Sequence, residues 1–322
     1  MLAAIAQSEL NITWAAEKMR ASQPALSRQL KLLEHELGFT IFQRNGRALT
    51  KVTPYGQKVI SRALKILQEM QAIRRISDET RGEKSGTLSI GTTHTQARYV
   101  LPPIIREFRL KYPEVDLHLH QGTSEQIAEM ARLDRIDFAI ATGSHELFET
   151  FVLLPCYQWR RCIVVPRDHP LTKIQKLSLK HLAAYPVVTY VFSFDSPSSL
   201  SEVFANAGLR LNVALTARDA DVIKTYVRLG LGVGIVADVA IDAETDHDLV
   251  ALDASNLFAA HTTWIGFARA GLLRGYMYDF MHLFAPHLTR RLVDRSMGAE
   301  TSEQLAALFT DIQLPARGQA VM

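Results

Sequence analysis

The sequence predicts a small winged helix-turn-helix, a long linker helix, and a larger α/β part built of two Rossmann-like lobes. Apolar residues recur at helical spacing until about residue 80, and strand and helix patterns alternate from residue 86 onward. Charge divides the chain at the same point. Residues 1–85 hold 14 Lys and Arg against 8 Asp and Glu, whereas residues 86–322 hold 22 against 25. The 322-residue length also fits more than one domain.

Composition and charge exclude several classes of protein. The excess of positive charge in the first 85 residues indicates a polyanionic partner for that part alone. Cys156 and Cys162 are the two cysteines, which excludes a disulfide framework and a cysteine-rich zinc site. The sequence has no uncharged apolar run of ~18 residues and no secretory-signal pattern at its start. We therefore expect a cytoplasmic protein with no membrane partner, no metal and no cofactor.

The basic part predicts two helices joined by a short turn. Thr13 is expected to cap the first helix, over residues 14–19, and Ser22 to cap the second. Pro24 falls in the first turn of the second helix, where its missing N–H costs nothing. One face of this helix is an apolar stripe of Leu26, Leu30, Leu33 and Leu37. The opposite face carries Gln23, Ser27, Arg28 and Lys31.

This polar face suits the reading of DNA. Gln and Arg side chains form paired hydrogen bonds with adenine and guanine, so Gln23, Ser27 and Arg28 are expected to reach base edges. The alternative is an ordinary solvated helix face. The next stretch favours DNA binding, because it predicts a hairpin of the kind that forms a wing.

The predicted hairpin has a strand over residues 39–42, a turn at Asn45-Gly46 and a returning strand at residues 48–50. Arg44, Arg47 and Lys51 would meet the phosphate backbone or the minor groove. A long helix follows at Thr53-Pro54, and its stripe of Ile60, Ala63, Leu67 and Met70 indicates a dimerising linker. The expected domains are 1–56 for DNA binding, 57–85 for the linker helix and hinge, and 86–322 for the body.

The body predicts two α/β lobes. Strands are expected at residues 87–91, 115–120 and 137–141, and helices at 96–112 and 123–133. A similar pattern recurs over residues 160–240, and the chain is expected to cross back near residues 262–267. The expected lobe boundaries are 86–160 with 266–290 for lobe I, and 161–265 for lobe II.

Polar side chains gather where the first strand of the body gives way to a helix. Residues 92–96 read Thr-Thr-His-Thr-Gln, and Thr142 holds a corresponding position after another strand. Backbone N–H groups and the positive end of a helix bind anions, and hydroxyl groups add donors without a countercharge. These residues therefore predict an anion site, although capping of the helix is the alternative.

The basic part resembles the winged helix-turn-helix of LysR-type transcriptional regulators. Residues 15–59 contain the elements Ala-Ala-Glu, Ser-Gln-Pro-Ala-Leu-Ser, Leu-Glu-x-Glu-Leu-Gly and, in a stretched form, Leu-Thr with a later Thr-x-x-Gly. The chain starts several residues into the first helix of the family pattern. Either the start is misassigned or the packing of that helix is weakened.

The body is similar to the CysB branch of the same family. The motifs that carry this resemblance lie at residues 92–99, 120–122, 137–142, 154–157, 221–234 and 284–289. It implies an α/β effector domain like that of periplasmic binding proteins, in a homotetramer, a dimer of dimers, that binds promoter DNA and contacts RNA polymerase. The implied function is control of sulfur assimilation or sulfonate genes in response to sulfate, acetylserine or a related compound. The alternative within this branch is another effector, as in a redox or stress response.

The resemblance also implies the residues of the effector site. Thr93, Thr95, Gln96 and Thr142 would hold the anion, with Trp159 nearby. Asp195 stands where the branch usually has a threonine of the ligand site. A carboxylate repels sulfate, so either Asp195 turns away to cap the next helix or the effector carries an amine or hydroxyl beside its acidic group.

Two other classes fit the sequence less well. An α/β enzyme would need a nucleophile–base pair or a metal motif, which this sequence lacks, so no catalytic residue is predicted. A solute-binding protein would share the two-lobed fold, but it would need an export signal and no helix-turn-helix.

Overall fold

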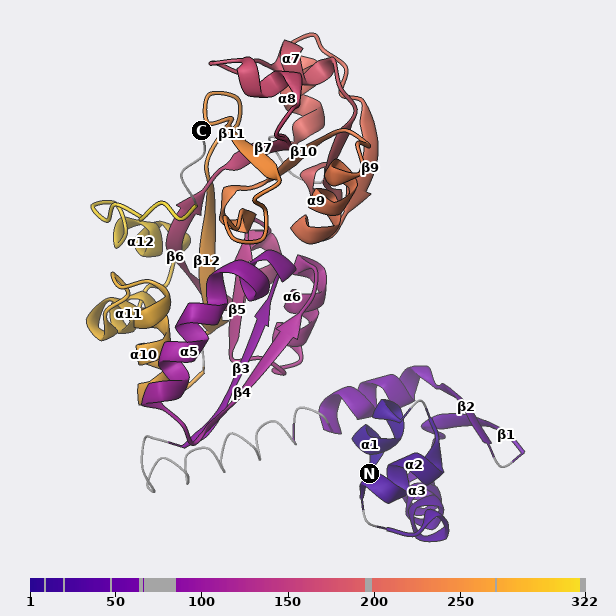
Figure 1. Cartoon of the computed structure of the whole chain (residues 1–322). Helices are drawn as coiled ribbons and strands as arrows, with labels where there is room; N and C mark the ends of the chain where they lie inside the picture. Colours follow the sequence, from indigo (N-terminus) through magenta and orange to yellow (C-terminus); the bar gives the residue numbers. More distant parts are fainter. Residues whose placement is uncertain are drawn as a thin grey trace. The chain divides into compact units, whose positions relative to one another are not determined.

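The computed structural model describes residues 1–8, 10–19, 21–46, 48–63, 66, 85–194, 199–269 and 271–318. The chain forms two compact units, residues 1–82 and 83–322, shown in Figure 1. Each unit is described by itself. Most of the predicted linker helix, together with Arg47 and Asp195, lies outside the described residues. Within them, no helix has the length and apolar character needed to span a membrane.

The first unit is a winged helix-turn-helix, as the sequence predicts. Its elements are α1 (Leu2–Gln7), α2 (Ile12–Lys18), α3 (Gln23–Leu37), β1 (Phe42–Asn45) and β2 (Ala48–Val52), followed by helical residues 54–63. Its core is formed by Ile5, Ala15, Leu26, Leu30, Ile41, Phe42 and Ile60. Gly56 packs so closely on α3's C-terminal loop that a Cβ there would lie 2.1 Å from the carbonyl oxygen of Ile41. Only glycine fits this contact.

The N-cap of α3 is the residue predicted from the sequence, whereas the N-cap of α2 is a different residue. Ser22 caps α3, as predicted, with its hydroxyl accepting from the Ala25 N–H at 3.4 Å. The predicted cap at Thr13 is wrong, because α2 begins earlier and its cap is Asn11. The Asn11 Oδ1 accepts from the N–H groups of Thr13 and Trp14 at 3.0 and 3.1 Å. One side chain thus satisfies two of the donors that a helix start leaves free.

The predicted strand at residues 39–42 is also displaced, since β1 begins at Phe42. The reason is Glu34, which is 9% exposed and whose Oε1 accepts from the N–H groups of Ile41 and Phe42 at 2.8 and 3.1 Å. The predicted turn at Asn45-Gly46 also changes at its first residue. Asn45 belongs to β1 and pairs with Ala48, so it is part of the strand and not of the turn.

The second unit contains two five-stranded sheets. Lobe I has the order β4-β3-β5-β12-β6, with β3 (Gly86–Thr92), β4 (Val115–Gln121), β5 (Phe138–Thr142), β6 (Phe151–Trp159) and β12 (His261–Ala268). Lobe II has the order β11-β7-β10-β8-β9, with β7 (Arg161–Pro166), β8 (Val187–Tyr190), β9 (Val213–Ala217), β10 (Val233–Ala237) and β11 (Leu249–Asp253). β12 pairs antiparallel with both β5 and β6, and Figure 1 shows β6 and β12 side by side.

Helices cover both faces of each sheet. Lobe I carries η1 (Gln96–Val100, a π-helix), α5 (Leu101–Lys111), α6 (Ser124–Arg132), η2 (His145–Phe148), α10 (Gly275–Phe284), α11 (Arg290–Met297) and α12 (Ser302–Ala307). Lobe II carries η3 (Pro170–Lys173), α7 (Leu179–Ala183), η4 (Val191–Phe194), α8 (Leu200–Asn206), α9 (Ala220–Arg228) and η5 (Asp238–Ala240). The core between α5, α10 and the lobe I sheet contains Phe108, Phe138 and Phe280, whose rings lie 5.4 to 5.8 Å apart.

A buried lysine joins the two lobes. Lys224 of α9 is 1% exposed, and its Nζ lies 2.7 Å from Asp246 Oδ2 and 3.0 Å from the carbonyl oxygen of Ala240. It also donates at 3.0 Å to the hydroxyl of Tyr99, which belongs to η1 of lobe I and itself donates to Asp221 at 2.5 Å. Every donor direction of the ammonium group thus has an acceptor, which is what a buried charge requires.

The end of the described chain adds a short segment to lobe I. The Gln158 N–H donates to the carbonyl oxygen of Pro315 at 2.9 Å, and the Arg317 N–H donates to that of Gln158 at 2.8 Å. The Arg317 guanidinium donates to the carbonyl oxygen of Phe284 at 2.6 Å and lies 4.9 Å from the centre of the Tyr157 ring. Arg317 therefore packs directly against a side chain of β6.

We predict that Glu34→Ala destabilises the first unit by about 2–4 kcal/mol, because two buried N–H groups lose their acceptor. Hydrogen exchange of the Ile41 and Phe42 amides in the full chain measures this effect. Glu36→Ala, at an exposed position of the same helix, is the control and should leave both amides protected. Unchanged protection in Glu34→Ala would contradict the role given to Glu34.

Candidate anion site and nucleic-acid interface

The predicted anion site lies where β3 ends and η1 begins. Thr92 is fully buried and donates its hydroxyl to the carbonyl oxygen of Ile140 at 3.1 Å, so it supports the sheet. Thr93 and Thr95 are half-buried, and Gln96 is 3% exposed. The Thr93 carbonyl oxygen accepts from the Ala97 N–H at 3.1 Å, which places Thr93 at the first turn of the helix.

A chain of hydrogen bonds connects three of the predicted residues. Tyr157 donates to Gln96 Oε1, and Gln96 Nε2 donates to the hydroxyl of Thr263 at 3.4 Å. The hydroxyls of Thr263 and Thr142 are 2.9 Å apart, and the indole N–H of Trp159 donates to Thr142 at 3.2 Å. We call these five residues the polar network. It brings Gln96, Thr142 and Trp159 together without any formal charge.

Two members of the polar network, Tyr157 and Thr263, were not predicted as site residues. Thr263 lies opposite Thr142 on β5 and opposite Tyr157 on β6. These partners are more than 100 residues apart from it in the chain, and no local spacing in the sequence connects them. The available signal was the expected crossing of the chain between the lobes near residues 262–267, a range that includes Thr263.

Thr95 contacts lobe II instead of the polar network. Its hydroxyl is hydrogen-bonded to that of Tyr190, which also accepts from the Ala237 N–H at 3.3 Å. Burial raises the pKa of Tyr190, so its phenol stays protonated. The predicted threonines thus face both lobes at their junction.

A histidine stacks on Trp159. The rings of His261 and Trp159 are 4.6 Å apart and 24° from parallel. The pKa of His261 is lowered to about 4, mainly because the ring is buried and to a lesser extent because Arg161 is positively charged. The imidazole is therefore neutral at pH 7.

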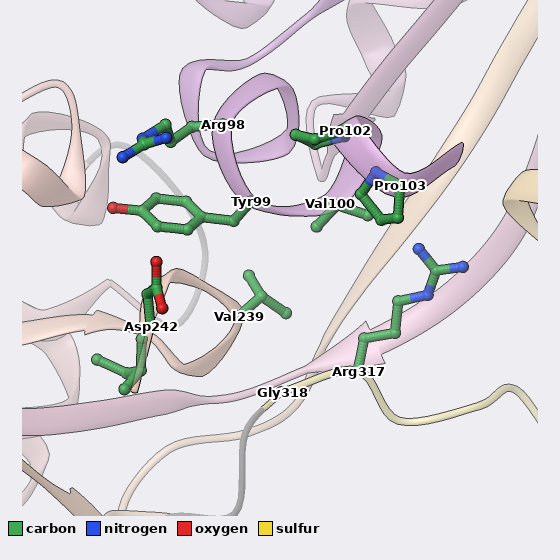
Figure 2. Close-up of a pocket in the computed structure, with 10 residues that line it drawn as sticks. Arg98, Tyr99, Val100, Pro102, Pro103, Val239, Asp242, Arg317 and Gly318 are labelled. Atoms are coloured by element: carbon green, nitrogen blue, oxygen red, sulfur yellow. The ribbon is translucent and has the colours of Figure 1, made fainter. Parts of the chain in front are cut away.

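An open pocket of about 430 Å³ lies nearby, between the start of α5, the η5 region and the end of the described chain. Its lining includes Arg98, Tyr99, Val239, Asp242 and Arg317, and Figure 2 shows the two arginines at opposite ends. None of the predicted effector residues lines it.

One group among the described residues has the composition of a metal site. His94, Asp219 and Asp221 bring ligand atoms within 4.8 Å of one another. However, Asp219 caps α9 by accepting from the Val222 N–H at 2.8 Å, and Asp221 accepts from Tyr99. Both carboxylates thus already have partners within the protein.

The first unit presents most of the predicted DNA-binding residues on one helix. Gln23, Pro24, Arg28 and Lys31 are exposed on α3, Ser27 is half-buried, and Ser22 caps the helix. Lys51 is exposed on β2. Arg44 of the wing differs, because its Nη2 lies 3.3 Å from Glu34 Oε2 and the side chain is 25% exposed. The ion pair with Glu34 thus holds Arg44 against its own unit, whereas the sequence predicts that this side chain meets the phosphate backbone or the minor groove of DNA.

Comparison with known families gives two matches that together cover most of the chain. Residues 1–57 match the model described as bacterial regulatory helix-turn-helix protein, lysR family. Residues 81–289 match the model described as LysR substrate binding domain.

Individual relatives agree with these matches. The chain is 46% identical over 310 residues to the HTH-type transcriptional regulator CysB of Haemophilus influenzae, covering 96% of each chain. It is 42% identical over 282 residues to the regulator SsuR of Burkholderia cenocepacia, covering 88% of this chain and 92% of that one. The cofactor-binding domain of the Cbl transcriptional regulator superposes with a TM-score of 0.62 at 40% identity, covering 66% of this chain and 93% of that one.

We predict that protonation of His261 destabilises the second unit in acid. Its pKa is about 4 in the folded chain and 6.5 in the unfolded chain, so the unfolded chain binds more protons between these values. The stability is fully present above pH 6.5, and about 2 kcal/mol of it should be lost as the pH falls toward 4.

Urea unfolding near neutral pH and near pH 4.5 measures this loss. His261→Gln should remove that part of the pH dependence, whereas His247→Gln, at an exposed position, should retain it. An unchanged pH dependence in His261→Gln would show that another group is responsible.

Proposed function

Because this chain belongs to the LysR family of bacterial transcriptional regulators, we propose that it controls sulfur-assimilation or sulfur-source genes in response to a small sulfur-related anion. It binds promoter DNA through α3 and the wing. The effector binds between the lobes, at the polar network and the first turn of η1. It acts in the cytoplasm as a homotetramer that contacts RNA polymerase.

The observation that carries this proposal is the polar network. Gln96, Thr142 and Trp159 come from three separate segments, and hydrogen bonds hold them in one place. Uncharged donors beside the start of a helix suit a small oxyanion, because they stabilise the charge without a competing carboxylate. The similarity to CysB, SsuR and Cbl regulators supports sulfur metabolism as the regulated process.

The same family supports a second possibility for the effector. A regulator of this branch could respond to a different, non-sulfate compound, as in a redox or stress response. The residue at position 195 bears on this choice, because an aspartate beside the anion would favour an effector that also carries an amine or hydroxyl. The regulators among the relatives and fold neighbours are not enzymes, and no catalytic role is proposed.

We predict that Arg28→Ala weakens binding to a target DNA by about 10-fold or more, because Arg28 is an exposed cation on the reading face of α3. The target is a fragment selected from random DNA by the wild-type chain, and binding is measured over a range of salt concentrations. Lys18→Ala, which removes an exposed cation from α2, is the matched control. Equal affinity and salt dependence in Arg28→Ala and wild type would contradict the assignment of α3 as the reading helix.

We predict that sodium sulfate or thiosulfate raises the melting temperature of the wild-type chain relative to sodium chloride of equal ionic strength. Gln96→Ala should abolish most of this stabilisation. Thr142→Val, which keeps the side-chain shape and removes one hydroxyl, should weaken binding by about 10-fold.

Gln175→Ala removes an exposed amide from lobe II and is the control for both variants. Stabilisation that persists in Gln96→Ala and Thr142→Val would place the anion elsewhere. No stabilisation of the wild type by either anion would favour the alternative effector.

A further inference from the structure

Arg161 is a buried arginine at the point where the chain passes from lobe I to lobe II. It is the first residue of β7, two positions after Trp159, and it pairs with Ala237 at the end of β10. Only 5% of its surface is exposed. A position at a strand end between the lobes is unusual for a side chain that carries a fixed positive charge.

Arg161 has no hydrogen bond or ion pair from its guanidinium to any residue that the structure describes. The guanidinium contacts an aromatic ring instead, and its carbon atom lies 5.9 Å from the centre of the Phe258 ring. Lys224 in the same unit shows the usual arrangement, with two oxygen atoms and a carboxylate around its ammonium group. A buried cation is costly unless an anion or several acceptors surround it, so Arg161 lacks a partner that Lys224 has.

The charge of Arg161 acts on two residues that touch the candidate anion site. One is His261, which stacks on Trp159 of the polar network. The other is Tyr190, which is hydrogen-bonded to Thr95. Burial lowers the pKa of Arg161 to about 10, so the guanidinium remains charged at neutral pH. Arg161 thus holds a permanent positive charge at the strand end two positions after Trp159, within electrostatic reach of His261 and Tyr190.

We propose that Arg161 is the cation of the effector site and forms an ion pair with the bound anion. The proposal rests on the proposed function and adds the chemical class of the ligand, an oxyanion such as sulfate, sulfonate or carboxylate. A guanidinium offers planar paired donors that match two oxygens of such a group. The polar network would then supply the remaining hydrogen bonds, and neutral analogues of the same shape would bind poorly.

The experiment compares Arg161→Gln and Arg161→Met with wild type, and Arg160→Gln serves as the matched control because Arg160 is the exposed neighbour. Binding of sodium sulfate and sodium methanesulfonate is measured by calorimetry at constant ionic strength, with dimethyl sulfone as the neutral analogue. We expect both Arg161 variants to bind the anions about 30-fold more weakly or worse, and Arg160→Gln to match wild type. Wild type should bind dimethyl sulfone no better than the Arg161 variants do.

Melting temperatures without anion separate this role from a purely structural one. If the partner of Arg161 is a bound anion, Arg161→Met should melt in chloride at a temperature at least as high as that of wild type, because the substitution removes an unpaired buried charge. A marked loss of stability in chloride would show that Arg161 is paired within the protein, and this would overturn the proposal. In wild type, NMR titration should show the His261 pKa rising when sulfate binds, because the anion neutralises the nearby cation.

The outcomes also separate this proposal from the proposed function. Sulfate binding that is weakened by Gln96→Ala but unchanged by Arg161→Gln overturns the role of Arg161 and leaves the effector site in place. Absence of binding to wild type by every anion tested overturns both the anionic effector and the role of Arg161. DNA binding by α3 is measured separately and stands in either case.

Discussion

The register of β12 between β5 and β6 is the constraint on which the polar network depends. Thr263 is fully buried in the central position of these three strands, and it faces Thr142 on one side and Tyr157 on the other. A buried hydroxyl needs hydrogen-bond partners, and here they are the Gln96 amide and the Thr142 hydroxyl. A shift of one residue would turn Thr263 to the other face of the sheet. The packing of the sheet and the position of the donors are therefore set by the same pairing.

Among the described residues of the second unit, the buried cations Lys224 and Arg161 have different surroundings. Lys224 is surrounded by acceptors from both lobes and so contributes to holding them together. Arg161, at the start of β7, lies over the aromatic ring of Phe258 and has no ion pair among the described residues. A protein usually neutralises such a charge with one of its own carboxylates. Where it does not, as for the guanidinium of Arg161, the unpaired charge is a physical basis for selecting an anionic ligand.

The fold and some residues of the candidate site could be predicted from the sequence, and the residues that were missed have a common explanation. Ser22 and the alternation of strands and helices follow from local patterns, and those predictions are confirmed. Gln96 and Thr142 were predicted from their places after two strands, and Trp159 was implied by the family resemblance. Their proximity in the structure is consistent with a common site. Thr263 and Glu34 were missed because each acts on residues brought near by tertiary structure. The role of Asp195, which lies outside the described residues, stays a prediction.

The packing of Arg317 limits where a recombinant fragment of this protein can end. Its guanidinium lies against Tyr157, and its backbone extends the edge of β6 through Gln158. A recombinant fragment that ends at residue 289, where the family match stops, would lack this support although it retains all ten strands of the two sheets. The Tyr157 ring would then gain rotational freedom and solvent access. The compact unit that contains the polar network thus extends beyond the residues that the family match covers.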